Sequence, residues 1–398
     1  MKIIESIIPC PKHRYQFSQP IEQIAFFDIE TTGLSPRASS LYLIGGMHYD
    51  SSQNQWILTQ WFADDYQSEA KILEAFLDYL QNFKVLYHFN GATFDIPYVL
   101  QKCEKHYISL PDYAREIFEN VLSYQTTDTE KLFCVDLLKE IRPLKKTLHL
   151  VKANQTALER WLGIQREDQY SGGELISVYA EYMQKKILHP EDASSLENLL
   201  LLHNHDDMEG MLSVCSILCF RDIHTLSETV IHNIEETPSA LRITFALPQP
   251  VPRPVTLHHI WDSPLLADQK ATLSLEADTG TLTLPLIKTM LKLFFTDYKN
   301  YFYLPSEDCA MHKSVAQFVD AAFRQKATAA TCYTKKEGRF FPCLAKKATA
   351  TEEPLFYQEH KTKPAFYLFD NKENGSLIEN ESLQKQLQSY LLQELSFF

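Results

Sequence analysis

Several features are missing from this 398-residue chain, and each absence excludes a class of protein. The eight cysteines form no CxxC pair, so we expect reduced thiols and no zinc site of the usual ligand spacing. No stretch approaches the ~18 apolar residues of a membrane helix, and the first residues hold no apolar core of signal-peptide length. We therefore expect a cytoplasmic protein that does not contact membranes.

An excess of positive charge is also missing. Residues 1–234 hold 20 Lys and Arg against 32 Asp and Glu, whereas residues 235–398 hold 18 against 19. An acidic chain is poorly suited to tight, nonspecific binding of duplex nucleic acid. The same acidity is no obstacle to an enzyme that holds cations between carboxylates.

The length and hydrophobic content predict two folded domains. Hydrophobic residues make up 45% of the chain and aromatic residues 12%, enough for a buried core, and the chain exceeds the roughly 250–300 residues of a single core. The composition changes at "TVIHNIEETPSA". We expect an N-terminal extension over 1–20, a first domain over 21–228 and an accessory domain over 235–398.

The order of the expected elements predicts the fold class. The first half begins with three strands, then a helix, a strand and a helix, expected over 24–30, 41–49, 55–63, 68–83, 84–89 and 94–106. This order indicates an α/β domain with a mixed sheet whose first strands are antiparallel. A long apolar helix is expected from about 194 to 222. The second half reads as α+β, with helices over 312–327 and 382–395.

Two carboxylates end the first expected strand, in "AFFDIETTGL". Asp28 and Glu30 are two residues apart, so in a strand they project from one face. Adjacent carboxylates repel each other unless a cation lies between them, and oxygen ligands suit Mg²⁺ or Mn²⁺. A solvated strand end is the alternative explanation for two such acids.

Acidic residues recur in two further stretches. In "HFNGATFDIP", Asp95 lies in the first turn of a helix, where the helix dipole also favours an acid. In "LLHNHDDMEGML", His203 and Asp207 are four apart and share one face of an otherwise apolar helix. Polar residues inside an apolar helix are costly in a pure packing role, although a solvated helix face remains the alternative.

Together these stretches resemble a known family. "FDIETTGL", "NGATFDIP" and "HNHDD", in this order, resemble the three exonuclease motifs of the DEDD superfamily, which has a ribonuclease H-like fold. The residues within these motifs are most similar to those of the bacterial YprB-type ribonuclease H-like proteins. The segment over 135–182, with "LGI", "RED" and a glycine turn, is similar to that branch as well. The resemblance covers about residues 22–222.

The resemblance implies a ribonuclease H-like mixed sheet flanked by helices and a two-metal active site. It implies Asp28, Glu30, Asp95 and Asp207 as ligands of two Mg²⁺ or Mn²⁺ ions, which can activate a water and stabilise the leaving oxygen. The superfamily usually places a tyrosine four residues before the last aspartate, or a histidine five before it. This chain has His203 at the tyrosine spacing, and we expect it to be the catalytic group that orients the water.

Several assignments stay open at this stage. Asn204 and His205 are weaker alternatives to His203, and Asp206 is an alternative ligand to Asp207. Asp136, at the end of an expected strand, either supports the site or has a structural role. We also expect substrate contacts from a second group of residues near the motifs: Thr31, Asn90, Phe94 and, for close approach of the backbone, Gly33.

The accessory domain contains one basic and aromatic segment, residues 312–347. It holds eight Lys and Arg against two acids, with five aromatic residues between them. Basic and aromatic side chains together grip single strands without reading their sequence, and we expect Lys335, Lys336 and Arg339 to contact substrate. An ordinary solvated face over a hydrophobic core is the alternative.

The sequence therefore predicts a metal-dependent 3′–5′ exonuclease that hydrolyses single-stranded DNA or RNA. The direction of cleavage comes from the resemblance. Two alternatives remain: a structure-selective endonuclease with the same site, and a non-catalytic module that binds nucleic acid or docks a partner protein through the accessory domain. The presence of all four acids disfavours the non-catalytic module. The residues do not distinguish DNA from RNA, because recognition of the 2′-hydroxyl depends on contacts that a sequence does not place.

Overall fold

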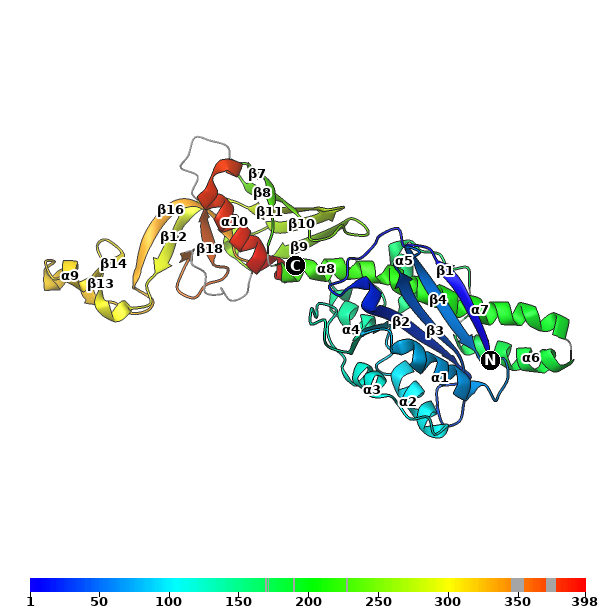
Figure 1. The fold of residues 1–398 in the computed structure, drawn as a ribbon. Coiled ribbons are helices and arrows are strands. Elements are labelled where there is room, and N and C mark those ends of the chain that lie inside the picture. The colour runs from blue at the N-terminus through cyan, green and yellow to red at the C-terminus, as the bar shows by residue number, and fades with distance from the viewer. Residues whose placement is uncertain (169, 171, 189, 227, 345–353, 370–376) are drawn as a thin grey trace. The chain divides into compact units, whose positions relative to one another are not determined.

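The structure is a computed structural model that describes residues 1–398 except 169, 171, 189, 227, 345–353 and 370–376 (Figure 1). The described residues form two compact units, Met1–Arg221 and Asp222–Phe398. No helix in this described part of the chain has the length and apolar character needed to cross a membrane.

A six-stranded mixed sheet forms the centre of the first unit, in the order β1-β4-β3-β2-β5-β6. Its strands are β1 (Lys2–Ile8), β2 (Ile24–Thr31), β3 (Leu41–Asp50), β4 (Gln55–Phe62), β5 (Val85–His88) and β6 (Phe133–Asp136). Strands β1 to β4 pair antiparallel with their neighbours, whereas β2, β5 and β6 run parallel. The predicted mixed sheet with antiparallel first strands is confirmed.

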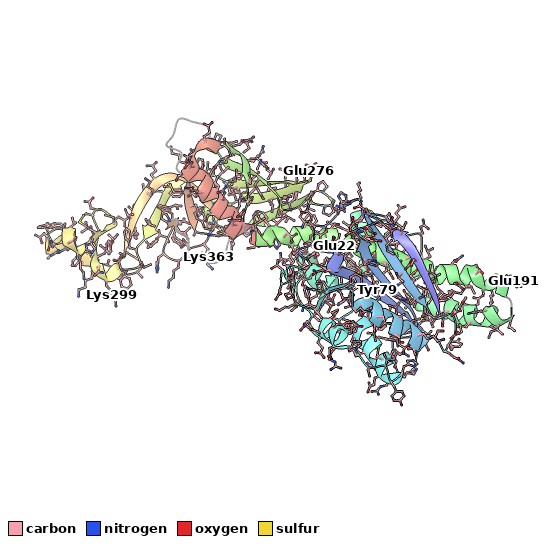
Figure 2. All side chains as sticks on the ribbon, viewed as in Figure 1. Glu22, Tyr79, Glu191, Glu276, Lys299 and Lys363 are labelled. Carbon is pink, nitrogen blue, oxygen red and sulfur yellow. The ribbon has the colours of Figure 1, made fainter. Side chains whose placement is uncertain are left out.

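The helices of the first unit lie on both faces of this sheet (Figure 1). They are α1 (Glu69–Leu80), α2 (Asp95–Lys105), α3 (Asp112–Glu119), α4 (Leu137–Ile141), α5 (Gln155–Leu162), α6 (Gly172–Leu188), α7 (Pro190–Val214) and α8 (Cys219–Asp222). On one face, Phe27 of β2 stacks on Phe76 of α1 and approaches Phe118 of α3. Tyr79 of α1, labelled in Figure 2, packs edge-on against Trp61 of β4 on the same face.

Helix α7 covers the opposite face, across β2, β3 and β4. Because side chains alternate along a strand, burial of Phe27 toward α1 turns Asp28 toward α7. Antiparallel pairing places Asp28 beside Gly45 of β3 and places Gly45 beside Gln60 of β4. The acidic end of β2 and the polar turn of α7 are thereby brought together.

Two sequence predictions for the first unit differ from the structure. Residues 1–20 were expected to be an extension, but Lys2–Ile8 form the edge strand β1, which pairs with β4 along its full length. The helix expected from about 194 to 222 is divided: α7 ends at Val214, and a tighter turn, Cys215–Leu218, separates it from α8. The Ser216 hydroxyl donates to the carbonyl of Ser213 there, a local bond that competes with the regular helix.

The second unit is rich in strands. Its elements are β7 (Ile231–Glu236), β8 (Ala240–Ala246), β9 (Val255–Ile260), β10 (Lys270–Glu276), β11 (Thr279–Pro285), β12 (Ile287–Phe294), β13 (Tyr301–Leu304), β14 (Cys309–His312), β15 (Gln325–Lys326), β16 (Tyr333–Pro342), β17 (Leu355–Phe356), β18 (Phe366–Phe369), α9 (Lys313–Ala316) and α10 (Glu381–Glu394). The strands form sheets of five, four and three strands. Helix α10 matches the predicted terminal helix within one residue at each end.

The helix predicted over 312–327 is wrong. Only α9 and a short turn over Ala321–Phe323 are helical there. Arg324 donates to the carbonyl of Ala316, and Asp320 caps the next turn. Phe318 and Phe323 are exposed, so these two apolar side chains do not provide the burial that would stabilise a longer helix.

Candidate metal and catalytic centre

Strand β2 and helix α7 supply most of the predicted site. Glu30 and His203 are both buried, and Asp207 is half-buried. The His203 Nε2 atom lies 3.6 Å from Glu30 Oε1 and 3.4 Å from Asp207 Oδ2. The ligand atoms of these three residues all fall within 4.8 Å of one another. That spacing suits side chains that converge on one small cation.

Asn204 connects Asp28 to the rest of the sheet. Its Nδ2 atom donates to Asp28 Oδ2 over 3.1 Å, and its Oδ1 atom accepts from Gln60 Nε2 over 3.0 Å. Gly45 makes this possible, because a Cβ atom there would lie 2.4 Å from Asn204 Oδ1. The sequence suggested Asn204 as an alternative to His203; in the structure, this amide orients a carboxylate.

Asp95 enters the site from the first turn of α2. Its carboxylate is buried and accepts hydrogen bonds from its own backbone amide and that of Ile29. The pKa of Asp95 is raised to about 7, chiefly by burial; the charges of Asp136 and Asp207 also raise this pKa, whereas the two backbone hydrogen bonds lower it. At neutral pH this acid is therefore readily protonated unless positive charge is nearby.

The other three acids are perturbed in the same direction. Burial is the largest cause of the raised pKa of Asp28, Glu30 and Asp207. Mutual repulsion adds to it, since Asp207 and Asp95 raise the pKa of both Asp28 and Glu30. We call Asp28, Glu30, Asp95 and Asp207 the carboxylate cluster.

The carboxylate cluster has the donor chemistry of a divalent-cation site. The four neighbouring carboxylates repel one another, and Arg166 and His203 supply the positive or polarisable groups that lower the pKa of Asp207. Oxygen donors of this kind suit Mg²⁺ or Mn²⁺, and a bound cation would relieve the repulsion. The residues present therefore fit the metal ions that the sequence predicted.

Two residues that the sequence reasoning did not identify hold α7 in place. Asp168 Oδ2 lies 2.5 Å from His203 Nδ1, and Asp168 is itself fixed by its backbone amide, which donates to Asp206 Oδ2 over 2.8 Å. Arg166 Nη2 lies 2.6 Å from Asp207 Oδ1. Arg166 and Asp168 belong to the "RED" of residues 135–182. The similarity of that segment to the YprB branch was the sequence signal that could have identified them.

Arg166 also bonds a second buried acid. Its Nε and Nη2 atoms donate to the two carboxylate oxygens of Glu159 over 2.5 and 2.7 Å. Gln155 Nε2 donates to Glu159 Oε1 over 3.0 Å and to the carbonyl of Asp207 over 2.7 Å. Helix α5 is thereby fastened to the turn of α7 that carries Asp207.

The structure separates the alternatives on α7. Asp207 is a member of the carboxylate cluster. Asp206 Oδ2 instead accepts a hydrogen bond from the backbone amide of Asp168, and Asp206 Oδ1 lies 3.8 Å from His205 Nδ1. His205 is thus placed with Asp206. Asp136 caps α4 through Leu138 and Lys139 and accepts from the Asn90 amide, so its structural role is clear.

The predicted substrate residues near the motifs lie beside the cluster. Thr31 follows Glu30 at an irregularity of the β2–β3 pairing, and its hydroxyl donates to the carbonyl of Gly33. Phe94 directly precedes α2. Asn90 has a φ of 64°, a left-handed conformation that asparagine tolerates. These three positions share one edge of the sheet with the acids.

In the second unit, the basic residues that were predicted to contact substrate are less favourably arranged to bind the phosphates of a nucleic-acid strand. Lys335 forms an ion pair with Asp308, and Arg339 forms one with Glu236. Lys336 adjoins Lys335 on β16 and so projects from the opposite face. The aromatic residues Tyr333, Phe340 and Phe341 are buried, whereas Lys346 and Lys347 lie outside the described residues.

The sheet order and the acidic edge define a ribonuclease H-like domain. Residues 25–219 match the family described as the RNase_H superfamily. One curated relative, the DNA polymerase of Ostreid herpesvirus 1 (isolate France), is 36% identical over 73 residues, which cover 18% of this chain and 4% of that polymerase.

A solved structure with some similarity is the family B DNA polymerase from the hyperthermophilic archaeon Pyrobaculum calidifontis. It superposes with a TM-score of 0.36 at 12% identity, covering 71% of this chain and 35% of that polymerase. This chain therefore spans only a small part of either polymerase.

Proposed function

We propose that this protein is a metal-dependent 3′–5′ exonuclease of the DEDD type, closest to the YprB branch, acting on single-stranded DNA or RNA. The observation that carries the proposal is the convergence of four acids and one histidine from three separate segments, in the arrangement that the motifs imply. A solvated strand end or helix face would leave these side chains exposed, whereas most of them are buried. Retention of all four acids favours chemistry over a passive binding role.

The four acids and His203 have different parts in the proposed reaction. Asp28, Glu30, Asp95 and Asp207 would hold two Mg²⁺ or Mn²⁺ ions, which when bound supply charge neutralisation and an activated water. His203 Nε2 points at the cluster, and because a carboxylate only accepts, the Nδ1 atom is the donor to Asp168. Nε2 is then free to accept a proton from the attacking water.

The protein's own contribution is largely positioning. Asn204 fixes the Asp28 carboxylate from one side, and Arg166 fixes that of Asp207 from the other. Groups aligned before the reaction stabilise developing charge without reorganising. Phosphodiester hydrolysis needs little covalent chemistry from the enzyme once water, phosphate and leaving oxygen are held in line.

The direct test uses 5′-labelled single-stranded oligonucleotides, one of DNA and one of RNA, with Mg²⁺ or Mn²⁺. We expect a ladder that shortens from the 3′ end, and we expect EDTA and the Asp28→Ala/Glu30→Ala variant to abolish it. The matched control is Glu74→Ala/Asp78→Ala, which removes two exposed acids of α1 and should leave the ladder unchanged. Internal cuts would indicate an endonuclease, and the absence of metal-dependent cleavage of either strand would refute the proposal.

A thermal-shift experiment tests the metal separately from activity. A ligand that binds only the folded state stabilises it by mass action, so Mn²⁺ should raise the Tm of the wild type. The Asp28→Ala/Glu30→Ala variant should show little or no rise, and Glu74→Ala/Asp78→Ala should respond like the wild type. An equal rise in all three proteins would exclude the carboxylate cluster as the metal site.

A further inference from the structure

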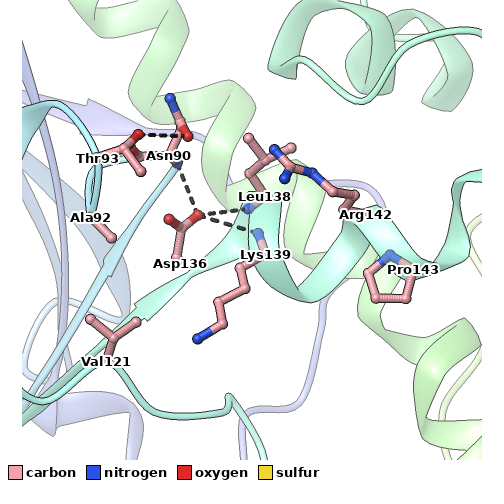
Figure 3. A pocket seen from close by; sticks show the side chains of 9 residues that line it. All are labelled: Asn90, Ala92, Thr93, Val121, Asp136, Leu138, Lys139, Arg142 and Pro143. Atoms are coloured by element: carbon pink, nitrogen blue, oxygen red, sulfur yellow. Dashed lines mark hydrogen bonds between the residues drawn. The ribbon is translucent and has the colours of Figure 1, made fainter.

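An open hollow lies where strands β5 and β6 end, beside the carboxylate cluster. Its volume is about 480 Å³, within the roughly 300–1,000 Å³ of ligand pockets in proteins. We call it the β5–β6 hollow; Figure 3 shows the side chains that line it: Asn90, Ala92, Thr93, Val121, Asp136, Leu138, Lys139, Arg142 and Pro143.

The floor of the hollow is fixed by one carboxylate. Asp136 Oδ1 accepts from the Asn90 amide over 3.0 Å on one side, and from the Leu138 and Lys139 amides over 3.1 and 3.3 Å on the other (Figure 3). Three amide donors largely satisfy this oxygen. The hollow is therefore shaped before any ligand arrives, which reduces the entropic cost of binding.

The rim carries unopposed positive charge in an otherwise acidic unit. Lys139 and Arg142 are exposed, and neither forms an ion pair with any residue that the structure describes. Lys145 and Lys146 follow on the adjoining turn and are also exposed. The acid within this segment, Glu140, is buried and paired with Arg221, so the solvent-facing charge of the segment is positive.

The hollow also has apolar surface and lies close to the cluster. Ala92, Val121, Leu138 and Pro143 contribute non-polar atoms to its lining. The turn that carries Asn90 leads directly into α2 and Asp95, and the charge of Asp136 is felt by Asp95. The hollow and the cluster are thus joined through the turn between β5 and α2.

We propose that the β5–β6 hollow binds the nucleotide next to the scissile phosphate, with Lys139 and Arg142 on its phosphate and the apolar wall against its base or sugar. Arginine and lysine bind phosphate oxygens through charge-assisted hydrogen bonds, and contact with phosphate and sugar is independent of base identity. This inference rests on the proposed function, since it assigns a substrate position to the same site.

The test measures binding without cleavage. Fluorescein-labelled dT12 and rU12 are titrated with the 398-residue protein in EDTA at 50 and 200 mM salt, and anisotropy is recorded. Lys139→Ala/Arg142→Ala should weaken binding about tenfold at 50 mM salt. Loss of two phosphate contacts should also reduce the slope of log K against log salt by about 1.4 for a single strand.

Two further variants separate charge from structure. Lys139→Arg/Arg142→Lys keeps both charges and should bind within about twofold of the wild type. Lys71→Ala/Arg115→Ala removes two exposed charges that do not line the hollow and should bind like the wild type. If the Lys139→Ala/Arg142→Ala protein binds like the wild type, or if the control loses as much affinity, the inference is overturned.

The outcome is distinguishable from that of the proposed function. Binding that depends on Lys139 and Arg142 in a protein that never cleaves a strand would uphold the hollow and refute the nuclease. Metal-dependent cleavage with unchanged binding in Lys139→Ala/Arg142→Ala would uphold the proposed nuclease activity and refute nucleotide binding by the β5–β6 hollow.

Discussion

His203 is held by Asp168 from the side opposite to the carboxylate cluster. The Nδ1 atom of His203 lies 2.5 Å from Asp168 Oδ2, whereas its Nε2 atom faces Glu30 and Asp207 at 3.6 and 3.4 Å. Such a partner fixes both the tautomer and the orientation of an imidazole ring. The pair therefore makes Asp168 a positioning residue for the proposed reaction.

Removal of Asp168 should impair turnover more than substrate binding. We expect Asp168→Ala to lower kcat about 10–100-fold with little change in KM, because the ring of His203 loses its orientation while the substrate contacts remain. Asp168→Asn keeps an acceptor oxygen and should retain more activity. Glu167→Ala, an exposed neighbour, is the control; a rise in KM with kcat unchanged would assign Asp168 to substrate binding.

Asp95 should make the metal-free protein less stable as the pH rises. Its pKa is raised from 3.8 to about 7 when folded, so between these values the unfolded chain releases a proton that the folded chain retains. In EDTA, Asp95→Asn should therefore exceed the wild type in free energy of unfolding by about 2–4 kcal/mol at pH 8, and the difference should vanish near pH 4.

Urea titrations across this pH range give the measurement. Buried His88, whose pKa is lowered to about 4, has the opposite pH dependence, but it is present in both proteins and cancels in the difference. Asp112→Asn, at the exposed start of α3, is the matched control and should show no such trend. A difference that is independent of pH would contradict the prediction.

Arg166 should be important for stability as well as for the site. Arg166→Ala leaves Glu159, which is 1% exposed, without its bidentate partner, and breaking a buried pair in this way costs about 3–5 kcal/mol. Chemical denaturation should show this loss, and Glu159→Gln/Arg166→Ala should recover part of it. The control is Arg160→Ala, which changes an exposed residue of α5, the helix that carries Glu159. It should change the free energy of unfolding by less than about 0.5 kcal/mol.

Gly45 should tolerate no side chain while Asn204 is present. A Cβ atom at Gly45 would lie 2.4 Å from Asn204 Oδ1, so Gly45→Ala should destabilise the protein by about 1–3 kcal/mol and disturb the bond to Asp28. The double variant Gly45→Ala/Asn204→Ala should lose less than the two single changes combined. Gly173→Ala, where no heavy atom lies within 4 Å, is the control; an equal loss there would exclude the clash as the cause.

The local pattern was sufficient to predict strands β2 to β6 and the pairs of residues that lie together on β2 and on α7. Alternation in β2 placed Asp28 and Glu30 together, and helical spacing in α7 placed His203 and Asp207 together. Both are short-range regularities. The family match over 25–219 supports the same assignment of the fold.

The remaining features depend on tertiary contacts between distant segments. Strand β1 pairs with residues 48 to 60 positions away, and nothing in its own seven residues specifies that partner. Arg166 and Asp168 lie between helices in a segment without periodicity, so their contacts with α7 could not be derived from spacing. The helix predicted over 312–327 failed because an apolar face stabilises a helix only where another surface covers it.

The carboxylate cluster depends on both ends of the first unit, since 179 positions separate Asp28 from Asp207 in the chain. During synthesis at about 5–20 residues per second, β2 would leave the ribosome roughly ten to forty seconds before α7. A nascent chain would thus carry only part of the site for that interval. The carboxylate cluster is therefore complete only after α7, which carries Asp207, has packed on the sheet.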